Sequence, residues 1–177
     1  LQYMSREKQL KIARETLEVF APLADRLNMG RVRVQLEELA FSYLEPKEFK
    51  RLRKIMKDRL GKSHRKLARV RHDVDKKLTD ENIPHSMDGR VKSVYSLYKK
   101  LKKVDSIDDV YDLIALRIIV DDIETCYRVL GVIHTMYRPM FDRIKDYIAQ
   151  PKPNGYQSLH TTIKTENDQI VEFQIRT

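Results

Sequence analysis

The spacing of the hydrophobic residues changes near Ile83, and this change constrains the fold more than any other feature of the sequence. Before it, apolar residues recur at helical spacing. After it, residues 113–120 (LIALRIIV) form a short run rich in branched side chains, and residues 169–176 (QIVEFQIR) alternate between apolar and polar side chains. Both segments are typical of strands. We therefore expect an all-helical segment followed by an α/β or α+β region with a mixed sheet.

The first third of the chain predicts helices and contains nothing that resembles a compact chemical site. Pro22 predicts a kink in the first helix, Pro46 suits the first turn of the third, and Gly61 is expected to end that third helix. The expected helices span residues 6–27, 31–44, 46–60 and 63–80.

The rest of the chain interleaves strands with helices. Clear strand patterns cover residues 113–120 and 169–176, and weaker ones cover 84–91, 143–148 and 158–164. Helical patterns cover residues 93–103, 106–112 and 122–137. In the last strand, Val171, Phe173 and Ile175 share one face, which leaves Glu172 and Gln174 on the other.

Composition narrows the choice of compartment and partner. A chain of 177 residues with 41% hydrophobic content can bury a proper core. The formal charge of +9 favours a polyanionic partner, such as a nucleic acid or nucleotide phosphates. A single cysteine, Cys126, excludes a disulfide framework. With neither a signal peptide nor a long apolar run, we expect a cytoplasmic protein without a membrane span.

A basic helix is expected within residues 89–103 (GRVKSVYSLYKKLKK). One face would carry ammonium groups and a hydroxyl, and the apolar back would anchor to a sheet. A solvated charged face is the ordinary alternative. Since the stripe contains no acidic residue, intrahelical pairs cannot neutralise it, and we expect it to bind an anion. The stripe comprises Lys92, Ser96, Lys99, Lys100 and Lys103.

Two carboxylates are candidates for metal-assisted phosphate chemistry. Asp112 would end a short helix just before the apolar strand, and Glu172 is the one carboxylate on the polar face of the last strand. Mg²⁺ prefers one or two carboxylates together with phosphate oxygens of a substrate. Salt-bridged surface acids are an equally open explanation.

Residues 152–162 (KPNGYQSLHTT) raise a similar question. The Asn154-Gly155 pair predicts a tight turn, and the polar side chains that follow fit either the outer face of a strand or a binding surface.

Four segments together resemble the synthetase domain of the RelA/SpoT family, whose members make the alarmone (p)ppGpp in the stringent response. They are GRVKSVYSLYKK, YDLIALRIIV, RIKDYIAQPKPNGYQSLHTT and VEFQIRT, in family order across residues 89–177. Residues 13–46 resemble the helices that close the hydrolase domain of long family members. The resemblance implies that residues 1–60 are the end of the hydrolase domain and a linker, and that residues 61–177 are a synthetase domain cut short at its C-terminus.

The resemblance further implies an α+β, nucleotidyltransferase-like fold in which a mixed sheet is flanked by helices. It implies transfer of pyrophosphate from ATP to the 3′-hydroxyl of GDP or GTP, with release of AMP. Arg90 and Arg117 would sandwich the adenine, and Lys92, Ser96 and Lys100 would hold the ATP phosphates. Asp112 would bind Mg²⁺. Glu172 would act as general base at the acceptor hydroxyl and as a second metal ligand.

The resemblance also implies an acceptor-nucleotide site, in which Tyr156 would stack on guanine. The residues around that nucleotide would be Lys145, Asn154, Gln157 and His160. Residues 143–146 match the basic form of a motif found in bifunctional members, so the parent protein would be bifunctional and associated with ribosome and tRNA. The hydrolase metal motif would lie upstream of Leu1, and we expect no hydrolase activity here. The alternative is a catalytically silent regulatory fragment that docks on RNA or the ribosome.

Overall fold

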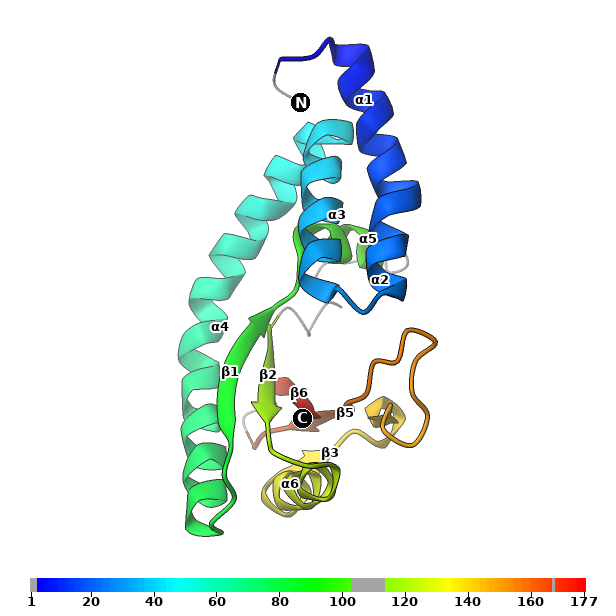
Figure 1. Ribbon diagram of the computed structural model, residues 1–177. Coiled ribbons are helices and arrows are strands. Elements are labelled where there is room, and N and C mark those ends of the chain that lie inside the picture. The colour runs from blue at the N-terminus through cyan, green and yellow to red at the C-terminus, as the bar shows by residue number, and fades with distance from the viewer. Residues whose placement is uncertain (1–2, 103–113, 167) are drawn as a thin grey trace. The chain divides into compact units, whose positions relative to one another are not determined.

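The computed structural model describes residues 3–102, 114–166 and 168–177, without side-chain detail at residues 60–66 and 114. The chain divides into two compact units (Figure 1). Unit 1 comprises residues 1–58, 93–110 and 153–155, and unit 2 comprises residues 59–92, 111–152 and 156–177. The division places the basic helix with the N-terminal helices. The functional boundary expected near residue 60 stays a prediction.

Unit 1 begins with a helical run that is broken where proline requires it. The run consists of α1 (Arg6–Glu15), a π-helical segment (Thr16–Phe20) and α2 (Ala21–Arg26). Pro22 has no N–H to donate, so regular α-helical bonding cannot pass through it. Just before it, the Ala21 N–H donates to Thr16 O, five residues back. The helix thus departs from regular α-helical bonding over Thr16–Phe20, just before Pro22, and the predicted kink itself stays a prediction.

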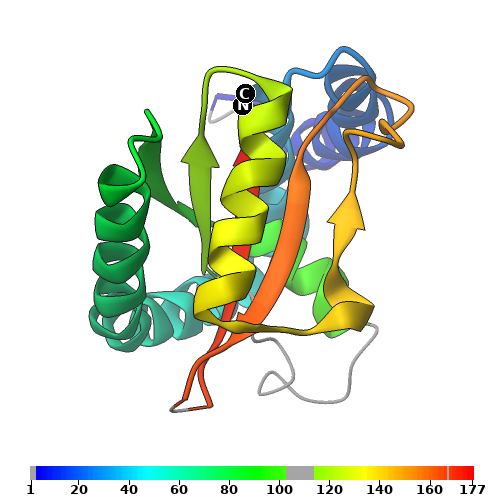
Figure 2. The same ribbon diagram turned by 90° about the horizontal axis from the view of Figure 1, so that it is seen from below.

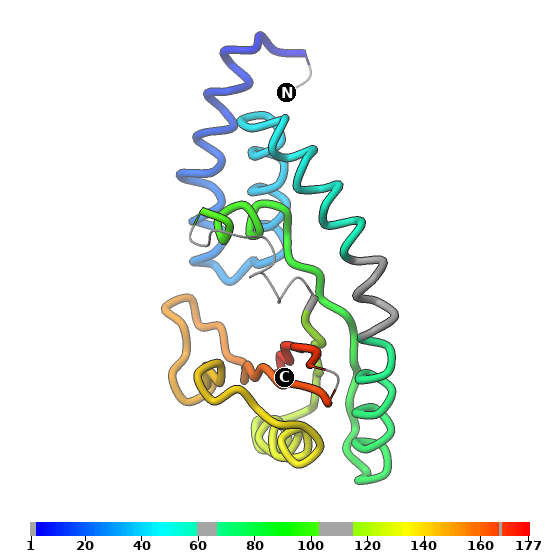
Figure 3. The backbone as a smooth tube through the Cα atoms, turned by 180° about the vertical axis from the view of Figure 1, so that it is seen from behind, coloured from blue at the N-terminus to red at the C-terminus, as the bar shows by residue number. Residues whose placement is uncertain are grey.

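In unit 1, α3 (Gly30–Leu44) runs antiparallel beside α1 (Figures 1 and 3). An Arg6 Nη2 donor at the start of α1 reaches Tyr43 O at the end of α3, 2.8 Å away. Phe41 of α3, 1% exposed, packs against Tyr98 of α5 (Val94–Leu101) with ring centroids 4.5 Å apart. Within unit 1 the aromatic side of the basic helix thus packs against a helix, and its expected anchoring to a sheet stays a prediction.

Helix α4 (Pro46–Asp80) contradicts the prediction that Gly61 ends one helix and a second begins at residue 63. A glycine within a helix costs about 1 kcal/mol relative to alanine, which alone does not terminate it. The apolar positions also keep the same helical phase on both sides of Gly61. Leu52 and Met56 are buried in unit 1, and Val70, Val74 and Leu78 are buried in unit 2.

Among the described residues, six strands form one mixed sheet in unit 2. The strand order is β1-β2-β6-β5-β3, and β4 pairs with β5. β2 and β6 are parallel, whereas the other pairs are antiparallel. The strands are β1 (Ser86–Val91), β2 (Ile114–Ile119), β3 (Arg138–Pro139), β4 (Lys145–Asp146), β5 (Leu159–Lys164) and β6 (Ile170–Arg176). The α+β class with a mixed sheet is confirmed.

Helix α6 (Ile123–Met136) covers one face of this sheet (Figure 2). The carboxylate of Asp122 accepts a hydrogen bond from Thr125 N at 2.7 Å and so caps the helix where the sequence predicted its start. The core joins α6 and the C-terminal half of α4 to the apolar side of the sheet. It includes Cys126, Val129, Ile133, Val70, Val74, Leu116, Ile118, Val171, Phe173 and Ile175.

The remaining predictions of strands and helices have mixed outcomes. The predicted strands over 84–91, 158–164 and 169–176 are confirmed, while the expected strand at 143–148 is reduced to the two residues of β4. The two-residue β3 was not predicted. The helix expected at 106–112 and Leu113 lie outside the described residues. Within the described part of the chain, no helix is long and apolar enough to cross a membrane.

Candidate active site

The face of the sheet opposite α6 carries a row of polar side chains from neighbouring strands. Strand register aligns Asp88 of β1 with Arg117 of β2, Arg117 with Gln174 of β6, Gln174 with His160 of β5, and His160 with Lys145 of β4. Residues at paired positions point to the same face of a sheet. Pairing between strands therefore brings the expected site residues Arg117, His160 and Lys145 onto one row.

A second row lies two residues along each strand. Its register aligns Arg90 of β1 with Ala115 of β2, Ala115 with Glu172 of β6, and Glu172 with Thr162 of β5. The small side chain of Ala115 stands between the positions of Arg90 and Glu172. Strands β1, β2, β4, β5 and β6 therefore each contribute charged or hydrogen-bonding groups to the face that α6 does not cover.

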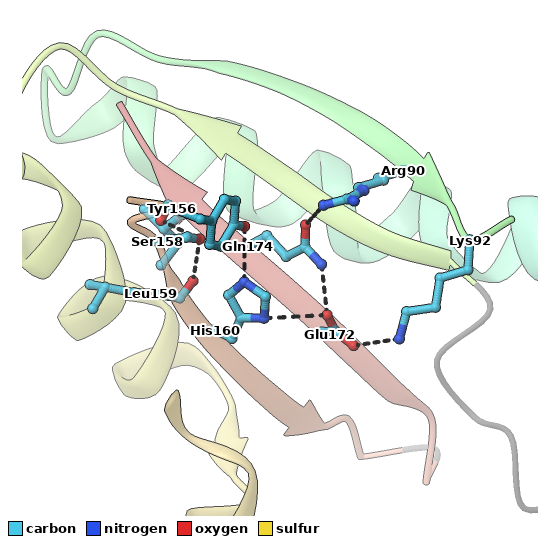
Figure 4. A network of polar contacts seen from close by, with 9 residues as sticks. Arg90, Lys92, Tyr156, Ser158, Leu159, His160, Glu172 and Gln174 are labelled. Atoms are coloured by element: carbon cyan, nitrogen blue, oxygen red, sulfur yellow. Dashed lines mark hydrogen bonds and ion pairs between the residues drawn. The ribbon is translucent and has the colours of Figure 1, made fainter. Parts of the chain in front are cut away.

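Glu172 lies at the centre of a polar network (Figure 4). Its side chain is 13% exposed, and its Oε2 lies 3.3 Å from Lys92 Nζ. Its Oε1 accepts a hydrogen bond from Gln174 Nε2 at 2.8 Å, and His160 Nδ1 lies 3.7 Å from the same oxygen. Glu172 is thus salt-bridged, as one explanation predicted, but it is not a solvated surface acid.

His160 faces Glu172 on one side and Tyr156 on the other. Burial lowers the pKa of His160 to about 4; Glu172 opposes this shift, while Lys152, Arg90 and Lys145 add to it. His160 is therefore neutral at pH 7, and its contact with Glu172 is not an ion pair. On the far side of the ring, the Tyr156 hydroxyl lies 3.1 Å from Nε2. A neutral imidazole in this position can donate from one nitrogen and accept at the other.

Tyr156 belongs to a group of aromatic rings and cations. Its ring meets those of Tyr147 and His160 edge to face, at centroid distances of 6.3 and 6.0 Å. The ammonium group of Lys152 lies 5.0 Å from its centroid and the guanidinium of Arg176 lies 5.3 Å from it. Cations near an aromatic face also attract a nucleotide's phosphates. Gln157, next in sequence, is exposed and donates to Ile148 O at 3.3 Å.

Arg117 is held by a partner that sequence reasoning missed. Asp88 of β1 accepts two hydrogen bonds from the Arg117 guanidinium, at 3.0 and 2.6 Å. These bonds hold the pKa of Asp88 below its usual range. A two-point pair fixes the plane of a guanidinium. The sequence offers no signal for this pair, because only the register of β1 and β2 brings its members together.

The basic stripe of the sequence is divided between the two units. Lys92 precedes the first turn of α5 and belongs to unit 2, whereas Ser96 and Lys100 lie on α5 in unit 1. Ser93 caps α5: its Oγ accepts from Ser96 N at 3.1 Å and donates to Ser96 Oγ at 2.8 Å. The structure does not place the two units relative to each other, so one phosphate-binding face made of Lys92, Ser96 and Lys100 stays a prediction.

The expectation that no carboxylate neutralises the stripe is wrong for Lys99. Its Nζ lies 2.9 Å from Glu37 Oε1, on a carboxylate that is only 7% exposed. Glu37 comes from α3, which is far away in sequence, so an argument from pairs within one helix could not find it. In addition, Lys99 lies 4.6 Å from the ring centroid of Tyr95. Lys99 of this stripe therefore holds α5 in place within unit 1.

Asn154 and Asp112 are the two expected site residues that remain. Asn154 belongs to unit 1, where its Nδ2 donates to Asp25 O at 3.0 Å. Its neighbour Gly155 has a φ of +74°, and Lys152 N donates to Tyr156 O at 3.2 Å, so the predicted turn is confirmed. Asp112 lies outside the described residues. Among the residues that the structure does describe, no three acidic, histidine or cysteine side chains form a metal cluster.

A family model described as a region found in RelA/SpoT proteins matches residues 89–177. A GTP pyrophosphokinase from Streptomyces antibioticus is 43% identical over 178 residues, which is all of this chain and 21% of that protein. The bifunctional (p)ppGpp synthase/hydrolase RelA of Mycobacterium tuberculosis is 42% identical over 178 residues, again all of this chain and 24% of that protein. The chain thus spans about a fifth to a quarter of these relatives.

Solved structures share the fold. The small alarmone synthetase 2 of Bacillus subtilis matches with a TM-score of 0.55 and 30% identity, over 68% of this chain and 71% of that one. The small alarmone synthetase 1 of the same organism, solved with its product pppGpp, matches with a TM-score of 0.56 over 70% of this chain and 73% of that one. At 23% identity, this second likeness supports the fold alone.

Proposed function

The chain belongs to the RelA/SpoT family, and we propose on that premise that it synthesises (p)ppGpp. In this reaction the 3′-oxygen of GDP or GTP attacks the β-phosphorus of ATP. The bond between that phosphorus and the oxygen bridging to the α-phosphate breaks, AMP leaves, and the hydroxyl proton passes to a base. The observation that carries the proposal is the half-buried Glu172 carboxylate, set between Lys92 and His160 on the polar face of the sheet.

Glu172 is the proposed general base. A ribose hydroxyl is a poor nucleophile at neutral pH, and a positioned base contributes about 10²–10⁴ in rate. The Glu172 side chain is 13% exposed, which shields the carboxylate from water yet leaves it reachable. Lys92, 3.3 Å away, neutralises the carboxylate in this structure and is proposed to turn to the ATP phosphates when they bind. Such an exchange would leave Glu172 free to accept the proton.

Arg90 and Arg117 are the proposed adenine clamp. Both stand on the polar face, on neighbouring strands β1 and β2 and in adjacent rows. Planar guanidinium groups stack on aromatic rings. The hold of Asp88 on Arg117 supports this role because it restricts the plane that a base would meet.

Ser96 and Lys100 are proposed to contact the ATP phosphates together with Lys92. The support is that Ser96 and Lys100, four residues apart on α5, share one face of that helix.

The acceptor nucleotide is proposed to bind beside Tyr156 and His160. Tyr156 would stack on guanine, and neutral His160 would hydrogen-bond to the nucleotide. Lys145, aligned with His160 across β4 and β5, would face the phosphates. Gln157 and Asn154 complete the proposed set from the segment 154–157. The cations around the Tyr156 ring support a site for an anionic, aromatic ligand.

Mg²⁺ is the proposed cofactor, and Glu172 and Asp112 are its proposed protein ligands. The donor chemistry of Glu172 fits a hard cation, because its carboxylate oxygens are directed toward other cationic or N–H groups. When bound, Mg²⁺ would offset the charge on the transferred phosphoryl groups. Binding at Glu172 requires Lys92 to move from Oε2. A cytoplasmic location, and ribosome and tRNA association of the longer parent protein, remain parts of the proposal.

One assay tests the function directly. The chain is incubated with ATP, Mg²⁺ and either GDP or GTP, and AMP and a 3′-pyrophosphorylated guanosine nucleotide are measured. We expect both products in equal amounts. An RNA-docking fragment would yield neither and would bind RNA without responding to GDP. A parallel incubation with ppGpp and Mn²⁺ tests the expected lack of hydrolysis, and release of pyrophosphate there would contradict it.

A further inference from the structure

Gln174 of β6 has a buried amide whose two ends are both engaged. The residue is only 4% exposed. Its Oε1 accepts from Arg90 Nη1 at 2.7 Å, and its Nε2 donates to Glu172 Oε1 at 2.8 Å (Figure 4). These partners fix the orientation of the amide. The reverse orientation would set an NH₂ group against the guanidinium and a carbonyl oxygen against the carboxylate.

We propose that Gln174 is a positioning residue that links the adenine clamp to the general base. It holds the Arg90 guanidinium at one end and the Glu172 carboxylate at the other, and it touches neither nucleotide. This inference rests on the proposed function, because it takes Arg90 as an ATP contact and Glu172 as the base.

Register explains why an amide is needed between these two charges. Arg90 and Glu172 flank Ala115 in one row, and the small Ala115 side chain leaves space above it. The Gln174 side chain, from the adjacent row, spans this space. Without the amide, a guanidinium and a carboxylate so placed would pair directly, because hydrogen bonds between charged groups are the strongest available. Such a pair would draw Arg90 away from adenine and occupy the base.

The two ends of the amide can be tested separately. Gln174→Met keeps the length of the side chain and removes both hydrogen bonds, whereas Gln174→Glu keeps an acceptor for Arg90 and removes the donor to Glu172. For Gln174→Met we expect the dissociation constant of a non-hydrolysable ATP analogue with Mg²⁺ to rise about tenfold, and kcat to fall about tenfold or more. For Gln174→Glu we expect kcat to fall about tenfold or more, because the donor to Glu172 is lost.

A double mutant separates positioning from a merely structural role. If Gln174 acts on ATP through Arg90, Gln174→Met should weaken ATP binding by less than about twofold in an Arg90→Ala background. The matched control is Gln169→Met, at the residue just before β6, which should leave both constants unchanged. Melting temperatures of all variants report whether the fold is kept.

Different results would overturn the role of Gln174 and the proposed (p)ppGpp synthesis. Independent, multiplying effects of Gln174→Met and Arg90→Ala on ATP affinity in an active parent chain would overturn the inference alone. So would a Gln174→Glu variant with unchanged kcat. A parent chain that neither binds ATP nor forms product would overturn the proposed function, and the inference would fall with it.

Discussion

The two faces of the sheet in unit 2 are built from the same strands, but one face packs into the core and the other carries the polar network. On β6, the side chains of Val171, Phe173 and Ile175 are 0–2% exposed and pack into the core beneath α6 and α4. Between them, Glu172 and Gln174 turn to the other face and form hydrogen bonds with charged groups. Because a strand alternates with a period of two, adjacent positions separate stability from chemistry.

Two histidines show the same contrast. His134 of α6 lies toward the core face, where its Nε2 is 2.8 Å from Thr161 Oγ1 of β5. His160 of the same strand lies on the polar face beside Glu172 and Tyr156. Burial lowers the pKa of both. The difference lies in their partners: a hydroxyl on the core face, and a network of charges on the polar face.

The largest effect is expected from Glu172→Gln. Glutamine keeps the shape of the side chain but cannot accept the proton, so the rate of synthesis should fall by about 10²–10⁴. The melting temperature should stay close to that of the parent chain, because the buried side of β6 is unchanged. Glu166→Gln, at an exposed position before β6, is the matched control and should keep full activity. Turnover of Glu172→Gln within a few fold of the parent would contradict the mechanism.

Phe173→Ala tests the other face one residue away. Phe173 is 0% exposed in the core, and removing a buried aromatic ring should lower the free energy of unfolding by about 3–5 kcal/mol. Denaturant titration measures this loss. In the fraction that stays folded, turnover should resemble that of the parent. A loss of turnover at full stability would mean that the two faces are not separable.

Tyr156→Ala should produce a smaller and more selective effect. Stacking of a base on an aromatic ring contributes about 1–3 kcal/mol, so the affinity for GDP or GTP should fall about 5- to 150-fold. ATP affinity should change little. Calorimetry with each nucleotide separates the two. An equal loss for both would indicate that Tyr156 supports the fold through its ring contacts instead.

The smallest effect is expected from His134→Gln, which should change how the free energy of unfolding depends on pH. Its pKa in the folded chain lies below its ordinary value because of burial. As pH falls below about 6.5, the unfolded chain therefore takes up the proton first, and the stability from the neutral ring is lost. His134→Gln should reduce the difference between the unfolding free energies at pH 7.5 and pH 5.5. If the difference between the two unfolding free energies were unchanged, protonation of His134 would not contribute to the pH dependence of stability.

The sequence predicted the elements whose pattern was strong and long. α6 and the strands β2 and β6 follow from their periodicity and branched residues, and the inward face of β6 follows from alternation. β3 could not be predicted, because it has two residues and one of them is Pro139. The prediction that a helix ends at Gly61 was wrong, because a glycine weakens a helix without ending it.

The sequence predicted residues of the candidate site but not how they contact one another. Composition and alternation drew attention to Glu172, and family resemblance supplied the roles of Arg90, Arg117, Tyr156 and His160, which stay predictions. Alternation placed Gln174 on the same face as Glu172 but did not predict its partners, and Asp88 carries no signal at all. Strand register brings both residues beside their charged partners, and register cannot be derived from a single sequence.

The position of β6 also bears on the order of events during synthesis. β6 is the last strand along the chain, yet it lies between β2 and β5 and joins them into one sheet. The antiparallel pair of β1 and β2, and β5 with β3 and β4, can each form earlier, but neither group can reach the other until residues 170–176 have left the ribosome. Elongation at about 5–20 residues per second therefore leaves the β2 edge open for several seconds and the β5 edge for about one to two seconds, during which a chaperone or a second nascent chain can reach them.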